Sequence, residues 1–269
     1  MIDIHSHILP GLDDGAQSIE ESVEMAKIAV KDGIKKIVCT PHLFRGNFNT
    51  GNFEIIDKKR QELELALEQN QVDIEIYSGA EVHVSHNLIE QIKNNKQFLV
   101  VNQSSYMLIE FPSSHIFAGV KELFFELMSE GITPIITHPE RNAVFTENPS
   151  LLFELIEMGA LTQVNSGSFV GLYGKRTAEM VLRFLDWNFV HFLGTDSHNT
   201  RSMSPILSDA LIRIQARMKE DVAQTLVWDN PQAVLENREI VYRPNPKNPA
   251  GKEKSLKVRL PIFKKRSKV

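Results

Sequence analysis

The chain has 269 residues, of which 42% are hydrophobic and 24% are charged, and its formal net charge is -4. This is the composition of an ordinary globular protein, and the length suffices for one large core. No apolar stretch reaches the roughly 18 to 20 residues that a membrane span needs, and no signal peptide precedes the first strand, so we expect a cytoplasmic protein without a transmembrane segment.

The charge is unevenly distributed along the chain. From residue 247 onward nine lysines and arginines face a single acidic residue, Glu253, so the preceding body is clearly acidic. An acidic body disfavours a nucleic-acid-binding surface but suits a site that gathers cations. We expect one domain over residues 1–243 and a basic, flexible tail over 244–269, for which contact with anionic lipid or an acidic partner is the alternative.

A unit of helix, glycine and strand recurs along the chain. Ser18 is a predicted N-cap, with Glu21 three residues on, for a helix that ends at Gly33 before a strand over 34–40. Helices over 118–130 and 149–158 end at glycines before strands over 133–137 and 161–164, and a helix over 174–187 precedes a strand over 189–193. Further strands are expected over residues 2–5, 74–77 and 106–111.

These strands are short, apolar and almost continuous, as expected when helices cover both faces of a parallel sheet. About seven strands separated by helices favour an α/β fold in which the sheet closes into a barrel. An open, doubly wound sheet is the alternative, because periodicity cannot show closure. In either architecture, ligands bind at the carboxyl ends of the strands.

Polar residues that can bind metals follow one predicted strand after another. Six strand ends carry them, in the segments Asp3–His7, Thr40–His42, Gly79–Glu81, Glu110–Pro112, His138–Arg141 and Asp196–His198. His5 and His7 are two residues apart, so their side chains project from the same face of a strand. If the strand assignment holds, the candidate ligands face one mouth: His5, His7, Asp14, His42, Glu81, Glu110, His138, Asp196 and His198.

Burying so many ionisable groups without cations would be very costly. Histidine with carboxylates and no cysteine suits catalytic manganese, iron or zinc better than a structural zinc site. Nine ligands exceed what one ion can use, and two or three clustered cations can activate water and draw in phosphate oxygens. Arg141, three residues after His138, is suited to bind a phosphate with its guanidinium group.

A rival site lies around Cys39 and Arg45, which have the Cys-x5-Arg spacing of cysteine-dependent phosphatases. In that class the loop amides bind phosphate and the cysteine attacks it. Here Pro41 removes one amide, no glycine lies between the two residues, and Cys39 ends an apolar strand. We therefore interpret Cys39 as a small buried residue and keep Arg45 as a candidate for the entrance of the site.

Other residues have weaker signals. His83, His86, His115 and His191 lack a strand-end motif, so we interpret them as structural or surface residues. Phe44, Phe48 and Phe53 are candidates for an apolar rim around an aromatic substrate, although packing against the body is an equal alternative.

The ordered set of motifs resembles a known family. Asp3–His7, Asp13–Gly15, Thr40–His42, Gly79–Glu81, Glu110–Pro112, His138–Arg141 and Asp196–His198 are similar to those of the PHP (polymerase and histidinol phosphatase) superfamily. Within it they resemble the manganese-dependent bacterial tyrosine phosphatases of the CpsB/CapC/YwqE type, over about residues 2–240. The resemblance implies a distorted, TIM-like (β/α)7 barrel of the PHP type with three metal ions.

The resemblance also implies roles for single residues. His5, His7, Glu81 and Asp196 would hold one ion; Glu81, Glu110 and His138 would hold a second; Asp14, His42 and His198 would hold the third. Arg141 would bind the phosphate. The implied substrate is a phosphorylated bacterial tyrosine kinase, whose dephosphorylation controls capsule or exopolysaccharide synthesis.

We therefore predict a metal-dependent protein-tyrosine phosphatase, with manganese as the favoured ion and iron or zinc as alternatives. A histidinol-phosphate or other small-molecule phosphatase on the same site is the nearest alternative, and a non-enzymatic metal-binding protein is another. The sequence is compatible with oligomerisation and does not identify the leaving-group acid.

Overall fold

The computed structural model describes residues 1–46, 48, 53–85 and 87–250. Residues 47 and 49–52 of the polar loop, His86 and residues 251–269 of the basic tail lie outside the described residues, so the interpretations of His86 and of most of the tail stay predictions. No helix in the described part of the chain is both long and apolar enough to span a bilayer.

The first helix shows why the sequence specifies its elements. Helix α1 (Ile19–Asp32) begins at Ser18, whose side-chain oxygen accepts a hydrogen bond from the Glu21 backbone N–H at 3.3 Å. It ends at Gly33, whose φ of 92° lies in the left-handed region that glycine adopts without steric cost. The predicted N-cap and the predicted stop are both confirmed.

The strands are parallel throughout and form two hydrogen-bonded sheets. The smaller sheet has the order β1-β2-β4 and the larger has the order β3-β5-β6-β7-β8-β9. Their bounds are β1 (Ile2–Ser6), β2 (Lys36–Cys39), β3 (His42–Leu43), β4 (Glu75–Ser78), β5 (Glu81–His83), β6 (Tyr106–Glu110), β7 (Thr133–Thr137), β8 (Leu161–Asn165) and β9 (Phe192–Gly194). The expected parallel α/β fold is confirmed.

Two neighbouring strands bend where one sheet gives way to the other. The chain passes from β2 to β3 through Pro41, which has no backbone N–H for a ladder, and from β4 to β5 through Gly79. A Cβ at Gly79 would lie 2.7 Å from Val38 Cγ1, so only glycine fits this close approach. The Glu81 N–H donates to the Pro41 carbonyl at 3.1 Å, which holds the two bends together.

The two outer strands of this arrangement, β1 and β9, also meet. The His7 N–H donates to the Ser197 carbonyl at 2.9 Å, and the Asp196 N–H donates to the His5 carbonyl at 2.8 Å. The contact is a single bridge, Ser6 to Ser197, with no longer ladder in the described chain. The strands therefore follow one another around a distorted barrel whose irregularities lie beside the strand ends that carry the polar motifs.

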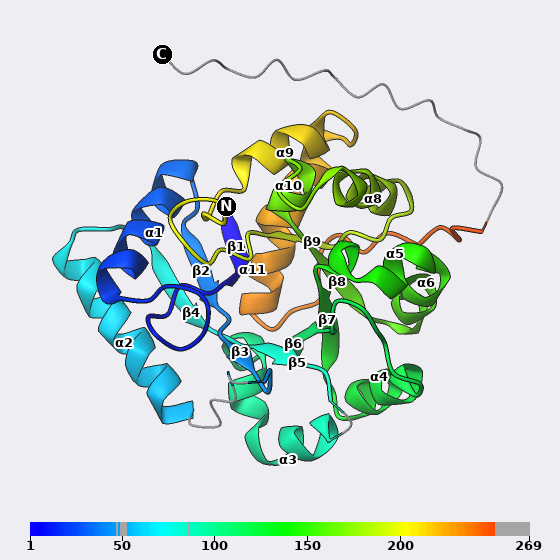
Figure 1. Cartoon of the computed structure of the whole chain (residues 1–269), viewed down its shortest axis with the longest axis horizontal. Helices are drawn as coiled ribbons and strands as arrows, with labels where there is room; N and C mark the ends of the chain where they lie inside the picture. Colours follow the sequence, from blue (N-terminus) through cyan, green and yellow to red (C-terminus); the bar gives the residue numbers. More distant parts are fainter. Residues whose placement is uncertain (47, 49–52, 86, 251–269) are drawn as a thin grey trace.

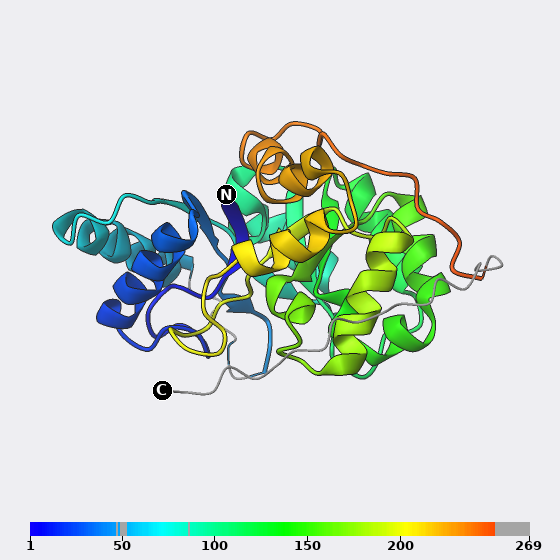
Figure 2. The ribbon, with the colours of Figure 1, turned by 90° about the horizontal axis from the view of Figure 1, so that it is seen from above.

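Helices surround the strands (Figure 1). Seen from above, α1 (Ile19–Asp32) and α2 (Phe53–Gln69) lie on one side of the molecule and the later helices lie on the other (Figure 2). Helix α2 lies beside α1, whereas the C-terminal helices pack near β1 and β9. The others are α3 (Leu88–Leu99), α4 (Val120–Ser129), α5 (Ala143–Glu147), α6 (Pro149–Met158), α7 (Ser166–Phe169), α8 (Lys175–Asp186), α9 (Ser208–Gln215), α10 (Glu220–Val227) and α11 (Asp229–Leu235). Apolar side chains from both layers form the core, including Phe124, Phe145, Phe184 and Phe192.

Candidate metal centre

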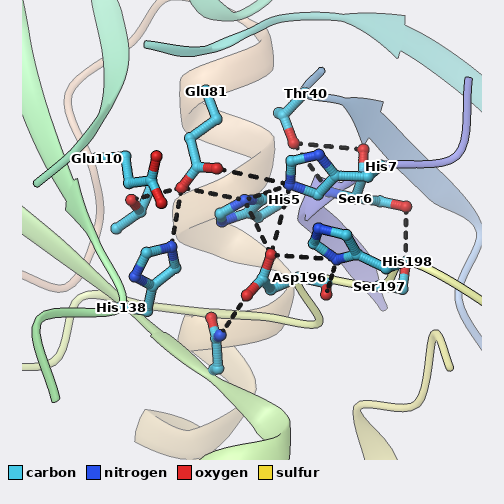
Figure 3. A network of polar contacts seen from close by, with 12 residues as sticks. His5, Ser6, His7, Thr40, Glu81, Glu110, His138, Asp196, Ser197 and His198 are labelled. Carbon is cyan, nitrogen blue, oxygen red and sulfur yellow. Dashed lines mark hydrogen bonds and ion pairs between the residues drawn. The ribbon is translucent and has the colours of Figure 1, made fainter. Parts of the chain in front are cut away.

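All nine predicted ligands lie together at the carboxyl ends of the strands. Figure 3 shows His5, His7, Glu81, Glu110, His138, Asp196 and His198 among them. They come from β1, β3, β5, β6 and the segments that follow β1, β7 and β9. All are buried except Asp14, which is exposed, and His198, which is half-buried. Stretches of chain nearly 200 residues apart therefore supply side chains to one cluster.

His5 and His7 point their Nε2 atoms at each other, 3.2 Å apart. Their other ring nitrogens have acceptor partners: His5 Nδ1 lies 2.7 Å from Gln163 Oε1, and His7 Nδ1 lies 2.8 Å from Asp13 Oδ2. Because a proton on each Nδ1 satisfies these acceptors, both Nε2 lone pairs face the same small space. A cation between them fits this arrangement.

Glu81 lies at the middle of the cluster. Its Oε1 is 2.9 Å from His138 Nε2 and 3.4 Å from His5 Nε2, and its Oε2 is 2.9 Å from His42 Nδ1. The Thr137 hydroxyl donates to Oε1 at 2.7 Å and so orients the carboxylate. Glu81 is fully buried, and each of its oxygens faces a different set of ligands, which suits a bridging carboxylate.

A second group of candidate ligands surrounds Asp14. Asp14 Oδ1 lies 3.3 Å from His42 Nε2 and 3.4 Å from His198 Nε2, while the His7 and His198 rings stack with centroids 4.0 Å apart. The family pattern implies an ion held by Asp14, His42 and His198, and in the structure His7 stands within ligand reach of this group as well.

The remaining groups overlap. Three sets of ligand atoms lie within 4.8 Å of one another: His5, His7 and Glu81; His5, His138 and Asp196; and His42, Glu81 and Glu110. The resemblance implied that Glu110 and His138 share an ion with Glu81. In the structure His138 Nε2 lies 2.9 Å from Glu81 Oε1, whereas Glu110 groups with Glu81 and His42, with its Oε2 3.8 Å from His42 Nδ1. The described chain therefore offers several adjoining positions for cations.

The charged groups of the cluster shift the pKa values of its members in the direction opposite to the effect of burial. Burial lowers the pKa of His5, but the carboxylates of Glu81 and Asp196 outweigh it and raise that pKa to about 9. Burial likewise raises the pKa of Asp196, yet His5 and the other histidines hold it well below its usual range. His5, His7 and His42 thus stand among carboxylates that raise their pKa values and favour positive charge, which a metal ion can supply in place of protons.

Two residues of the cluster have strained backbones. His138 has φ 32° and Asp196 has φ 53°, in the left-handed region that residues other than glycine rarely adopt. Such conformations cost about 1–3 kcal/mol each and persist where the surroundings impose them. Here they turn both side chains toward Glu81 and His5.

Several residues that support the ligands were not assigned roles from the sequence. Asp13, which only appeared in a family motif, binds His7 Nδ1 and accepts the His42 backbone N–H at 3.0 Å. Gln163 supports His5, and Asn165 Nδ2 donates to Asp196 Oδ2 at 2.7 Å. Gln163 and Asn165 are amide side chains two residues apart in strand β8, and this was the available signal.

A cavity of about 380 Å³ opens beside the cluster. Its lining combines the ligands Glu110 and His138, the two predicted arginines and an apolar wall: Arg45, Arg141, Phe111, Pro112 and Phe145 are among its residues. Arg141 Nη1 lies 2.5 Å from Asp196 Oδ2, and Arg45 Nη1 lies 3.4 Å from Glu110 Oε1. Both guanidinium groups therefore face a space next to the candidate metal positions.

His83 also lines this cavity, and its Nδ1 lies 3.0 Å from Glu110 Oε2. A structural or surface role is expected for His83 from the sequence, and in the structure it is half-buried and contacts a candidate ligand. His115 is exposed, and His191 is fully buried just before β9, outside the cluster.

The rival cysteine site has no support in the geometry. Cys39 is 1% exposed, and burial raises the pKa of its thiol, so a reactive thiolate is disfavoured.

The three phenylalanines predicted as an apolar rim have different surroundings. The Phe48 ring stacks on His42 at 5.8 Å, whereas Phe53 stacks on Phe98 at 4.5 Å and Phe44 packs against the core. Only Phe48 lies against the cluster.

The barrel and its ligands define a class of protein: a parallel α/β barrel with a candidate multinuclear metal centre at the carboxyl ends of its strands. Residues 1–236 match the model of the family described as capsular polysaccharide synthesis, CpsB/CapC, and the chain belongs to this family. The family predicted from the motifs is confirmed.

Named relatives are similar over most of their length. Tyrosine-protein phosphatase YwqE of Bacillus subtilis is 36% identical over 244 residues, covering 91% of this chain and 95% of the relative. Tyrosine-protein phosphatase CpsB of Streptococcus pneumoniae is 33% identical over 240 residues, covering 87% and 98%.

Solved structures agree with the fold. A crystal structure from work on YwqE of B. subtilis and CpsB of S. pneumoniae, described as unique metal-dependent tyrosine phosphatases, has a TM-score of 0.87 at 35% identity and covers 92% of this chain and 99% of that chain. The phosphotriesterase of Mycobacterium tuberculosis has a TM-score of 0.53 at 12% identity over 88% of this chain, which shows a likeness of fold alone. The parallel α/β class expected from the sequence is thus confirmed.

Proposed function

We propose that this protein is a metal-dependent protein-tyrosine phosphatase that hydrolyses phosphotyrosine on a bacterial tyrosine kinase. The observation that carries the proposal is the convergence of nine histidines and carboxylates beside a cavity with two arginines and a phenylalanine wall. The relatives' names support the reaction, and the apolar wall suits an aromatic phosphoester.

His5, His7, Glu81 and Asp196 are proposed to hold one ion, Glu81, Glu110 and His138 a second, and Asp14, His42 and His198 a third. The donor set of imidazole and carboxylate suits manganese, which we favour, or iron or zinc. When bound, the ions supply an activated water and stabilise negative charge on the phosphate oxygens. Gln163 and Asp13 keep the metal-binding nitrogens of His5 and His7 free of protons.

Arg141 is proposed to bind the phosphate and to stabilise the charge that develops on its oxygens in the transition state. One of its nitrogens is held by Asp196, which leaves the rest of the guanidinium for the substrate. Arg45, whose side chain is 40% exposed, is proposed to guide the phosphate in at the mouth of the cavity. Such roles need no proton transfer from either arginine.

The family description supports a cellular role in capsule or exopolysaccharide synthesis. In this role the substrate is a phosphorylated tyrosine kinase, and the enzyme acts in the cytoplasm. The substrate reaches the site as a flexible segment, because the cavity admits a side chain rather than a folded surface.

The test is a comparison of turnover on a phosphotyrosine peptide and on histidinol phosphate by the manganese-loaded protein. We expect a higher kcat/KM on the peptide and loss of activity after chelation, with recovery on return of metal. A strong preference for histidinol phosphate would overturn the proposed substrate, and turnover that survives complete removal of metal would overturn the proposed mechanism.

A further inference from the structure

The segment that follows β8 lies directly beside the candidate centre. Helix α7 is tied to the strand-end motif of β7, because the Ser168 hydroxyl donates to Glu140 Oε1 at 2.6 Å. The chain then turns back on α7, with the Leu172 N–H donating to the Gly167 carbonyl at 2.9 Å. Gly171 and Gly174, with φ of 84° and 90°, bracket this turn and position Tyr173.

The Tyr173 ring supports the guanidinium of Arg141. The Arg141 Cζ atom lies 4.3 Å from the ring centroid, so the cation stands over the face of the aromatic system. On another side, Arg141 Nη1 is held by Asp196 Oδ2 at 2.5 Å. A long, flexible side chain is thus held at two points, although 34% of its surface remains exposed toward the cavity.

The ring itself is firmly packed from behind. A Cβ added at Gly167 would lie 3.2 Å from Tyr173 Cε2 and 2.9 Å from Leu172 Cδ2, so the absence of a side chain at 167 lets the ring approach α7 closely. A ring seated against backbone in this way cannot retreat from the guanidinium without moving the turn. The packing thus preserves the contact with Arg141.

The hydroxyl of Tyr173 contributes less than its ring to holding the Arg141 guanidinium. Its oxygen is buried and has no hydrogen-bond partner among the described residues. Burial raises the pKa of Tyr173 to about 12, and the Asp196 carboxylate adds to the rise, so the phenol carries no negative charge that would repel phosphate at neutral pH. The neutral aromatic face is therefore the part that can act on Arg141.

We propose that Tyr173 is a positioning residue for phosphate binding: its ring holds the Arg141 guanidinium in the orientation in which its free N–H groups meet the phosphate. This inference rests on the proposed phosphatase function, and it adds a residue from outside every metal-ligand motif. Losing the contact costs the pre-organisation of Arg141 rather than the guanidinium itself.

The experiment compares Tyr173→Phe and Tyr173→Leu, alone and in an Arg141→Ala background, with phosphotyrosine peptide turnover and inorganic phosphate affinity as readouts. Tyr173→Phe should stay within about twofold of the wild type, whereas Tyr173→Leu should lower kcat/KM and phosphate affinity about tenfold, as expected for a partly desolvated cation–aromatic contact. In the Arg141→Ala background, Tyr173→Leu should have no further effect. Gly167→Ala should reproduce part of the loss by displacing the ring.

Tyr77→Leu is the matched control, because it removes a tyrosine ring on β4 that lies 5.5 Å from a different cation, Lys36 Nζ. It should leave both readouts unchanged, and the metal content of all variants should equal that of the wild type. A Tyr173→Leu enzyme with normal phosphate affinity, or an equal additional loss in the Arg141→Ala background, would refute the inference. Absence of phosphotyrosine turnover by the metal-loaded wild type would instead refute the proposed function, while phosphate affinity would still test Tyr173.

Discussion

Buried histidines at the two ends of the barrel have opposite electrostatic surroundings. At the carboxyl end, Glu81 and Asp196 raise the pKa of His5 to about 9 despite its burial. At the amino end, just before β9, burial lowers the pKa of His191 to about 3, and the Arg243 charge adds to this effect. Both side chains are 0% exposed, so burial alone does not distinguish them.

The difference lies in the partners. His191 Nδ1 accepts the Thr162 backbone N–H at 3.2 Å, a neutral contact that suits a structural histidine. His5 instead faces two carboxylates and the nitrogen of His7. A buried histidine among carboxylates is suited to hold a cation, whereas one among neutral groups is suited to stay uncharged.

The largest effect should come from removing the central carboxylate of the carboxyl end. Glu81→Ala removes a group that contacts His5, His42 and His138, so the ions should bind poorly and kcat/KM should fall by about a thousandfold or more. Phosphotyrosine turnover and metal content measured on the same sample check this. Unchanged hydrolysis would show that the cluster is not the active site.

A smaller effect is expected from the residue that supports His7. Asp13→Asn keeps the size of the side chain but weakens the acceptor for the His7 Nδ1 proton, so metal affinity should fall about 10- to 100-fold. Metal titration of the purified variant measures the change. Asp57→Asn, at an exposed position on α2, should bind metal like the wild type, and equal affinities for all three proteins would contradict the supporting role.

The neutral state of His191 at the amino end can be tested through the pH dependence of the free energy of unfolding. An unfolded histidine titrates at about 6.5, so between that pH and about 3 the unfolded chain binds a proton that folded His191 does not. This histidine therefore makes stability fall as pH falls through that window. At pH 5 the titration of His191 lowers the free energy of unfolding by about 2 kcal/mol, because each unit between the pH and the unfolded pKa is worth about 1.4 kcal/mol.

His191→Asn retains an acceptor for the Thr162 N–H and cannot titrate. The variant should therefore lose about 2 kcal/mol less stability than the wild type between about pH 8 and pH 5, as measured by urea unfolding of the metal-free proteins. His115→Asn, at an exposed position, should keep the wild-type pH dependence. An identical pH dependence for His191→Asn would show that His191 is not held neutral by burial.

The smallest effect is expected at Cys39. Cys39→Ser should keep kcat/KM within about twofold of the wild type, since the buried thiol is held in its neutral form and lies on an apolar strand. Its stability should fall by about 1–3 kcal/mol, because a hydroxyl replaces a weakly polar group in the core. Loss of phosphotyrosine turnover by a folded Cys39→Ser enzyme would instead support the cysteine mechanism.

Much of the centre could be predicted because its ligands follow a regular pattern. Six of the seven predicted strands end in a polar motif, and parallel strands present those ends at one mouth. Asp13, Gln163 and Tyr173 could not be found in this way, because their roles depend on which strand or turn lies beside a ligand. Tyr173 contacts Arg141 only through the turn between α7 and α8, and 32 residues separate the two.

The helices and strands also divide into those that a local sequence signal predicts and those that it does not. The helices and strands marked by a cap or a glycine were predicted within a few residues, as with Ser18 and Gly33. The short strands β3 and β5 were not predicted, since two or three residues give no periodicity. Helices α2, α3, α5, α7, α9, α10 and α11 were also not predicted. The strand expected over 189–193 begins only at Phe192, because residues 187–189 still close the end of α8 through hydrogen bonds to its carbonyls.

The paired bends beside Pro41 and Gly79 have a consequence for how this protein can change. Cys39 pairs with Ser78 before the bends, and His42 pairs with Glu81 after them. The link from β2 to β3 and the link from β4 to β5 therefore have the same number of residues. Adding or deleting one residue on either side would shift the register and turn a ligand to the opposite face. Within this stretch, any change in length would have to occur in both strands at once.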